Sequence, residues 1–92
     1  MEFEWHSAKA AENLGKHRVS FAEAATVFGD YLAATAQDPD HSGSESRFIT
    51  IGMSNRRRLL MVAHAERNER IRIISARKLT HNERRIYEQT QG

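Results

Sequence analysis

The hydrophobic residues of this 92-residue chain recur at helical spacing in its first third and in strand-like alternation afterwards. Residues 3–5, Phe-Glu-Trp, alternate apolar and polar side chains, which predicts a short strand. Residues 7–17 carry two alanines and a leucine three positions apart, and this spacing predicts a helix. Because glycine adopts a left-handed backbone at little cost, Gly15 is the residue expected to end this helix.

A second helix is predicted directly after the first. Ser20 can cap it and Glu23 follows three residues later, so each side chain is expected to bond a free backbone N–H of the other. Gly29 is expected to end the helix. One apolar stripe runs along it, formed by Phe21, Ala24, Ala25 and Phe28.

From Tyr31 onward the pattern predicts strands. They are expected at residues 31–37, 47–53, 59–65 and 70–76, with a polar, turn-rich loop over 38–46 and short hairpin connections between the later strands. Thr80 and Glu83 repeat the capping pattern and predict a final helix over 81–89, with Ile86 as its main apolar anchor. The predicted order is β-α-α-β-β-β-β-α, an α+β fold with helices on one face of a mainly antiparallel sheet.

Charge is distributed unevenly along the chain. Residues 1–46 carry three basic and eight acidic side chains, whereas residues 47–92 carry eleven basic and four acidic ones. A basic half of this kind attracts nucleic acid or an acidic protein, although a solvated arginine-rich surface is an equally good interpretation. The length predicts a single domain over 1–92, and the absence of cysteine, signal peptide and membrane span favours a soluble cytoplasmic protein.

Strand alternation suggests which side chains stand on the uncovered sheet face. Arg70 and Arg72 share one side of the last strand, while Arg77 lies at the end of the other. Arginine suits phosphate because its planar fork of donors engages two oxygens and stays charged. Together with Arg47 and His64, these arginines are the candidates for a site on the sheet.

The histidines and carboxylates leave alternatives open. His64 could transfer a proton, but a histidine on an apolar strand is more often structural. Lys16 and His17 form a basic pair that could bind an anion or simply complement a helix dipole. Glu45, two residues before Arg47, could be a general base or a surface ion-pair partner. The histidines show no metal-ligand spacing, so neither a metal nor another cofactor is expected.

Several ordered motifs together resemble the BrnT family, the toxin components of bacterial type II toxin–antitoxin modules. They are K-H-x-V-S-F at residues 16–21, E-x-R at 45–47, I-R-I-I-S-A-R at 71–77 and E-R-x-x-Y at 83–87. The resemblance extends from Phe3 to Tyr87. One departure is His6, where the family usually has aspartate; histidine is a poor helix cap, so Ser7 takes over the cap or about 1 kcal/mol of stability is lost.

The resemblance implies a RelE-like fold and an endoribonuclease that arrests translation. Because the sequence shows no metal-ligand spacing, this nuclease is expected to be metal-independent. It also implies a BrnA-type antitoxin with a ribbon-helix-helix domain, expected in a 2:2 complex that alone binds operator DNA. On this basis three arginines are expected to bind RNA phosphate: Arg47, Arg72 and Arg77. The general base is expected to be Glu45 or His64, and the supporting donors are Tyr87, His17 and Lys16. Ser75 and Glu83 also match the family pattern. The alternative is a non-catalytic module that binds nucleic acid or antitoxin through a basic sheet face.

Overall fold

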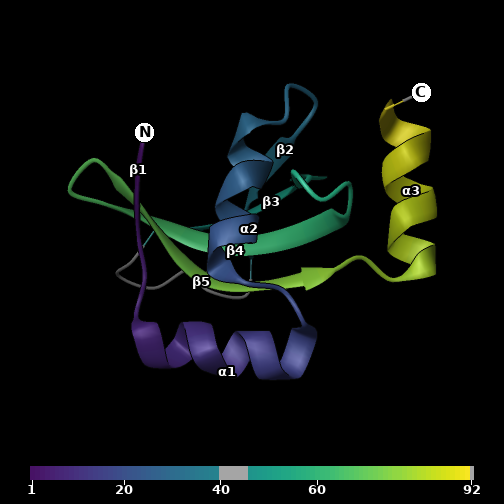
Figure 1. Cartoon of the computed structure of the whole chain (residues 1–92). Coiled ribbons are helices and arrows are strands. Elements are labelled where there is room, and N and C mark those ends of the chain that lie inside the picture. Colours follow the sequence, from purple (N-terminus) through teal and green to yellow (C-terminus); the bar gives the residue numbers. More distant parts are fainter. Residues whose placement is uncertain (40–45, 92) are drawn as a thin grey trace.

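The computed structural model describes residues 1–39 and 46–91, which form a five-stranded sheet and three helices (Figure 1). The strand order is β1-β5-β4-β3-β2; β1 runs parallel to β5, and the other neighbours are antiparallel. This confirms the predicted element order and the α+β class. Most of the predicted polar loop lies outside the described residues. The elements are β1 (Glu2–Glu4), α1 (Ser7–His17), α2 (Phe21–Thr26) with a 3-10 turn (Val27–Gly29), β2 (Ala34–Gln37), β3 (Arg47–Met53), β4 (Leu59–Arg67), β5 (Arg70–Lys78) and α3 (His81–Gln91).

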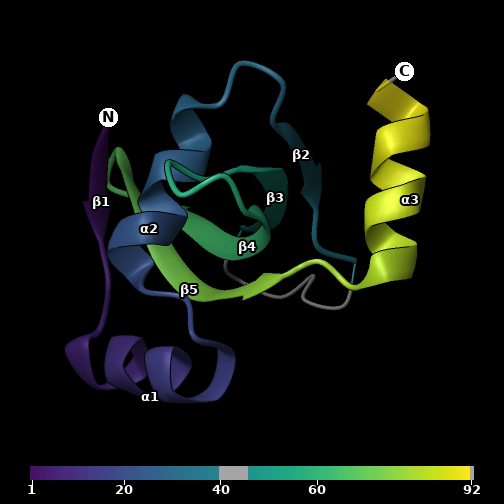
Figure 2. The ribbon, with the colours of Figure 1, turned by 45° about the vertical axis from the view of Figure 1, so that its right-hand side comes forward.

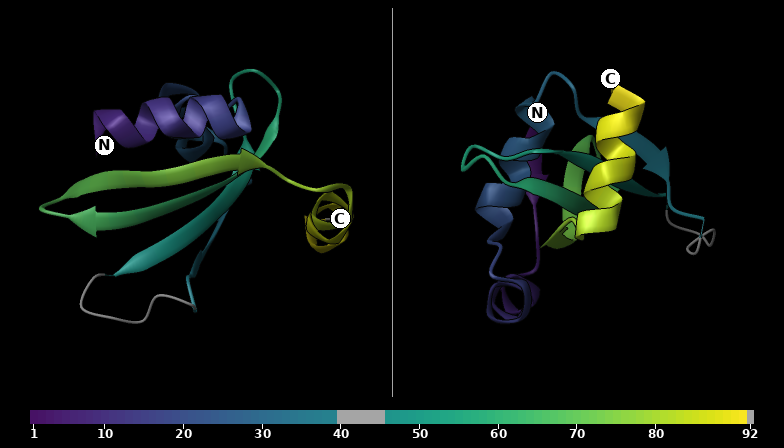
Figure 3. Two further views of the ribbon diagram at one scale, coloured as in Figure 1. Left: turned by 90° about the horizontal axis from the view of Figure 1, so that it is seen from below. Right: turned by 90° about the vertical axis from the view of Figure 1, so that its right-hand side faces the viewer.

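The core lies between α2 and one face of the sheet. Helices α1 and α2 are on the same side of the sheet, with α1 along the edge of β5, whereas α3 stands beyond the end of β5 (Figure 3). Burial of these apolar side chains is the main force holding the helices in place. The buried cluster comprises Val19, Phe21, Ala24, Val27, Leu60, Val62, Ile73 and Ala76.

Helix α1 differs from expectation in where it ends and in which face it buries. Gly15 lies inside the helix, and Arg18 instead adopts the left-handed conformation (φ 60°), with its N–H bonded to Leu14 O at 3.0 Å. Leu14 is half exposed, while Asn13 is buried against the sheet. At the other end His6 occupies the cap position without a side-chain cap bond. The helix is therefore attached through the buried amide of Asn13 together with Ala10, which packs against the core.

The cap of α2 forms only half of the predicted pair. Ser20 Oγ accepts a bond from Glu23 N at 3.0 Å, but the Glu23 carboxylate turns away from Ser20. It accepts bonds from Ser54 Oγ at 2.7 Å and Arg58 Nε at 2.9 Å, and Arg58 also bonds Arg18 O at 3.0 Å. Hydrogen bonding from Arg58 lowers the pKa of buried Glu23. This ion pair ties the β3–β4 hairpin to the junction of α1 and α2.

Helix α3 is attached by polar contacts. Both halves of its predicted capping box form: Thr80 N donates to Glu83 Oε1 at 2.8 Å, and Glu83 N donates to Thr80 Oγ1 at 3.2 Å. The prediction that Ile86 anchors the helix is wrong, because that side chain is 55% exposed. Figure 2 shows α3 at the opposite end of the molecule from α1.

His64 is buried on the helix-covered face of β4. Its Nε2 lies 2.7 Å from Thr50 Oγ1, its ring contacts the rings of Phe28 and Phe48, and within the described residues Nδ1 has no hydrogen-bond partner. Burial lowers the pKa of His64, since the charged imidazolium is disfavoured away from water. The expectation that His64 stands beside the arginines on the uncovered face is therefore wrong.

We predict that buried His64 makes stability fall as pH drops below about 6.5, the ordinary histidine pKa. Because the folded-state pKa is lowered, the unfolded chain takes up the proton first, and one group contributes at most about 1.4 kcal/mol per pH unit. Thermal and urea unfolding of the wild type and His64→Gln between pH 7.5 and 5 measures this. The variant should show the smaller loss of stability, whereas identical pH dependence would contradict the assignment.

Candidate active site

A β-bulge in β5 decides which arginines share a face. Ser75 pairs with Ala63 and Ile73 with His64, so Ile74 is an extra residue that shifts the alternation. As a result Ile73 and Ala76 both face the core, whereas the sequence alternation placed them on opposite sides. Arg77, paired with Met61, consequently lies on the same uncovered face as the arginines before the bulge. The prediction that Arg77 lies on the other face is wrong for this reason.

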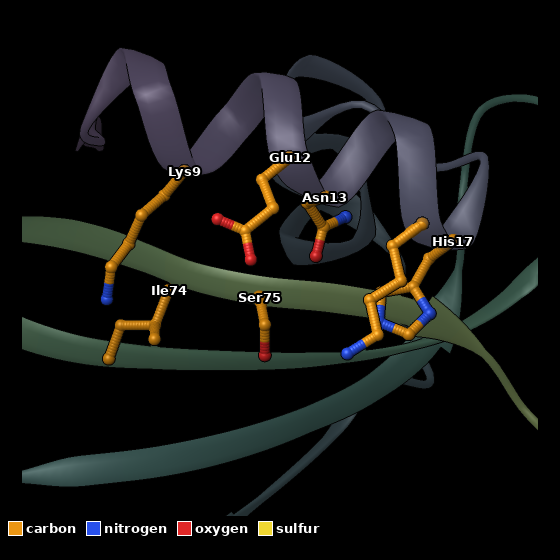
Figure 4. Close-up of a pocket in the computed structure, with 7 residues that line it drawn as sticks. Lys9, Glu12, Asn13, His17, Ile74 and Ser75 are labelled. Atoms are coloured by element: carbon orange, nitrogen blue, oxygen red, sulfur yellow. The ribbon is translucent and has the colours of Figure 1, made fainter.

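Beside the bulge, the end of α1 and the strand enclose a first cleft of about 270 Å³, here called the α1 cleft (Figure 4). Figure 4 shows Lys9, Glu12 and His17 projecting from α1 across β5 toward Ile74 and Ser75. The helix thus supplies a wall of charged side chains over a strand floor. The lining residues are Lys9, Glu12, Asn13, Lys16, His17, Ile74 and Ser75.

A second cleft of about 360 Å³, the sheet cleft, continues from the first over the uncovered face. The two clefts share His17, Ile74 and Ser75, so they adjoin at the bulge. Arg47 and Arg77 are the basic strand residues that line the sheet cleft. Its apolar lining comes from Ile49, Met61, Ala63, Ile74 and Ala76, and Asp38 completes it.

Asn13 holds the two walls of the α1 cleft together. Its Nδ2 donates to Val19 O and to Ala76 O, both at 2.9 Å, and its Oδ1 accepts from Ala76 N at 3.1 Å. Both polar groups of this buried amide are therefore satisfied, and both backbone polar groups of Ala76 are bonded. The basic pair at the end of α1 is fixed over the bulge by this contact.

Arg77 is held firmly by the first turn of α3. Its Nη1 and Nη2 donate to Glu83 Oε1 and Oε2 at 2.8 and 2.9 Å, the two-pronged geometry that arginine and carboxylate favour. Hydrogen bonding from Arg77, followed by the bond from the Thr80 backbone, lowers the pKa of Glu83 to about 2. The pair therefore stays ionised at physiological pH and orients a guanidinium at the sheet cleft.

Arg70 and Arg72 lie on the same face but outside both clefts, where they pair with strand β1. Arg70 Nε is 3.2 Å from Glu2 Oε2, and Arg72 Nη1 is 3.3 Å from Glu4 Oε2. The parallel register places each glutamate opposite its arginine. These contacts give Arg72 a role in attaching β1 to the sheet, in addition to any contact with a ligand.

Two further predicted residues lie away from the clefts, and one cannot be placed. His64 is on the opposite face of the sheet. Tyr87 donates its hydroxyl to Leu32 O at 3.1 Å, and burial, with a smaller effect of Asp30, raises the pKa of that phenol. Glu45 lies outside the described residues.

The sequence interpretation missed Lys9, Glu12 and Asn13 as cleft residues. A usable signal was present: Lys9, Asn13 and Lys16 recur at helical spacing and so lie on one side of α1. The apolar residues of the helix, Ala8, Ala11 and Leu14, form a separate pattern that does not point to this polar stripe. Asn13 carries no signal by itself, because its structural role comes from a hydrogen bond to Ala76, 63 residues further along the chain.

The site as described combines cations, one imidazole and two carboxylates, Glu12 and Asp38, around a partly apolar floor. Among residues 1–39 and 46–91, no group of three or more His, Asp or Glu side chains could hold a metal ion. No helix in the described part of the chain is long and apolar enough to cross a membrane. The chemistry available to the cleft residues is anion binding by Lys16, Arg47 and Arg77, with proton transfer by His17.

Comparison with known proteins gives one family and one fold. The family model described as "Ribonuclease toxin, BrnT, of type II toxin-antitoxin system" matches residues 5–83. A 1.1 Å crystal structure of the Brucella abortus ribonuclease toxin BrnT superimposes with a TM-score of 0.68 and 24% sequence identity, over 88% of this chain and 99% of that one. A comparison with curated protein sequences gave no match.

Proposed function

We propose that this chain, which belongs to the BrnT family of ribonuclease toxins of type II toxin–antitoxin systems, cleaves RNA where the α1 cleft meets the sheet cleft. The observation that carries this proposal is the convergence of His17, Arg47 and Arg77 on one cleft, with Lys16 in the adjoining one. An RNA phosphate at the junction would contact cations from two walls. The single imidazole shared by both clefts is then placed beside that phosphate.

The proposed reaction uses the RNA itself as nucleophile. The 2′-hydroxyl attacks the adjacent phosphorus, a base accepts its proton, and the 5′-oxygen leaves with a proton from an acid. This gives a 2′,3′-cyclic phosphate and a 5′-hydroxyl, so atoms and charges balance without a co-reactant. His17 is the described residue best placed for proton transfer. Glu45, two residues before the cleft residue Arg47, is the second candidate for the base.

The cations act on the charge that develops around phosphorus. Arg77, fixed by Glu83, offers an oriented guanidinium that needs no rearrangement when substrate binds. Arg47 lies across the sheet cleft and Lys16 on the helical wall. Arg72 is proposed as an outer phosphate contact, because it shares the face but lines neither cleft. The mechanism is proposed to be metal-independent, since the chain's own side chains supply each function it requires.

We predict that the purified protein cleaves RNA in EDTA and that His17→Ala lowers the rate about a hundredfold or more. Removal of the imidazole should also change the shape of the pH–rate profile, because a proton-transfer group is lost. His81→Ala is the matched control, because His81 is exposed on α3 and lines neither cleft. Gel analysis of a defined RNA and detection of the cyclic phosphate provide the measurement.

Each outcome of that assay separates the proposal from its rivals. Activity that disappears with chelator and returns with magnesium would contradict the metal-independent mechanism. Binding of RNA without any cleavage would instead favour the non-catalytic module.

The proposed partner is an antitoxin of the BrnA type. Membership of the toxin–antitoxin family implies an antitoxin, and the cluster of cations in the clefts is a suitable target for an acidic segment that excludes RNA. If the antitoxin carries a ribbon-helix-helix domain, its own dimerisation would bring two toxins together. Operator DNA is then bound by the complex, and the contacts to the DNA are assigned to the antitoxin.

We predict a 2:2 complex when toxin and antitoxin are co-expressed, measured by size-exclusion chromatography with light scattering. The complex should bind operator DNA with sequence specificity. The toxin alone should show at most weak, salt-sensitive binding, because only phosphate contacts are available to it. A stable 1:1 complex, or sequence-specific operator binding by the toxin alone, would refute this assignment.

A further inference from the structure

Glu12 is an unusual residue for a cleft that binds a polyanion. It lies on the helical wall of the α1 cleft, and its carboxylate points across the cleft toward Ser75 (Figure 4). Lys9 and Lys16 stand about one helical turn to either side of it. Within the described residues, however, the Glu12 carboxylate makes neither an ion pair nor a hydrogen bond with these lysines or with any other side chain or backbone group. Its oxygens are therefore available to a ligand.

A phosphate cannot be that ligand, because a carboxylate only accepts hydrogen bonds and carries the same sign of charge. A nucleotide base can, provided that it presents donors. The junction of the two clefts holds the scissile phosphate in the proposed function, on which this inference rests. The α1 cleft then receives the base next to that phosphate, since the two clefts adjoin at His17 and Ser75.

The four bases differ in how well they match a carboxylate. Guanine presents two N–H donors side by side, at N1 and at the exocyclic N2, with the O6 acceptor next to them. Adenine and cytosine each place an acceptor beside a single amino donor, and uracil places its single N–H between two acceptors. Both oxygens of one carboxylate can thus be used only by guanine, and a neighbouring lysine suits its O6.

The other polar groups of the α1 cleft do not offer a competing selection. The Asn13 amide is occupied by the backbone of Val19 and Ala76. The Ser75 hydroxyl can donate or accept and so does not distinguish bases. Lys9 and Lys16 only donate, which suits the phosphate oxygens of any nucleotide and the acceptor atoms that every base presents. His17, the remaining polar residue of the cleft, is assigned to the phosphate in the proposed function. Discrimination therefore falls to Glu12.

We propose that Glu12 is the specificity-determining residue of this nuclease and that it selects a guanine beside the scissile phosphate through the N1–H and N2–H donors of the base. The substrate is accordingly single-stranded RNA, because those donors are engaged in base pairing in a duplex.

Binding of short 2′-O-methyl RNA oligonucleotides tests this without cleavage, because the nucleophilic hydroxyl is blocked. Fluorescence anisotropy compares oligonucleotides in which one central position is guanine, inosine, 7-deazaguanine, adenine, cytosine or uracil. The wild type should prefer guanine to adenine by about tenfold or more, the discrimination typical of a two-pronged contact. Inosine, which lacks the N2 amino group, should be intermediate, whereas 7-deazaguanine should bind like guanine.

Glu12→Gln should abolish the preference for guanine. Glu88→Gln, which removes the same charge from α3 and lines neither cleft, should retain it. Equal affinity of the wild type for all bases, or a preference that survives Glu12→Gln, would overturn the proposal. The inosine comparison uses unmodified protein, so the test does not depend on the folding of a variant.

Parallel cleavage of an unmodified RNA library distinguishes this inference from the proposed function. Cleavage next to guanine that becomes indiscriminate in Glu12→Gln supports both. Indiscriminate cleavage by the wild type overturns the role of Glu12 alone. Selective binding of guanine with no cleavage supports the role of Glu12 as a reader of bases and overturns the nuclease.

Discussion

The clefts depend on one buried amide. Asn13 bonds the carbonyl of Val19 and both backbone groups of Ala76, and so joins α1, the connection between α1 and α2, and strand β5 at one point. An unsatisfied polar group at such a buried position would cost about 1–3 kcal/mol, so the arrangement is well specified. The bulge at Ile74 lies directly beside this contact in β5. The amide therefore also fixes the position of the bulge relative to α1.

The abundant arginines turn out to have several roles. Arg70 and Arg72 pair with Glu2 and Glu4 and secure a three-residue strand at the edge of the sheet. Arg58 joins a hairpin to the helices through Glu23. Such pairs are geometrically specific, although those on the surface contribute little to stability. The opposite charges of the two halves of the sequence are thus partly matched within the fold. Lys9, Lys16, Arg47 and Arg77 are the lysines and arginines that line the clefts, and Arg77 is itself paired with Glu83.

Local patterns in the sequence were sufficient to predict the elements, whereas the site depended on contacts between distant residues. Strand alternation and the caps at Ser20 and Thr80 gave the order of helices and strands because those signals act over a few residues. The bulge could not be predicted from local alternation. The one extra residue that it inserts moves Arg77 to the opposite face of the strand from the one that alternation assigns. His64 was misplaced because its burial comes from Phe28 and from helices packed above the strand.

The central claim is that RNA binds where α1 meets the bulge of β5. Its most direct test is a ¹H–¹⁵N NMR titration with a non-cleavable 2′-O-methyl oligonucleotide. The predicted result is that the largest shift changes occur at the backbone amides of Lys16, His17 and Ser75 and at the Arg77 side chain, with the buried region around His64 unaffected. Shift changes confined to strand β1 with Arg70 and Arg72, or to α3, would contradict the claim.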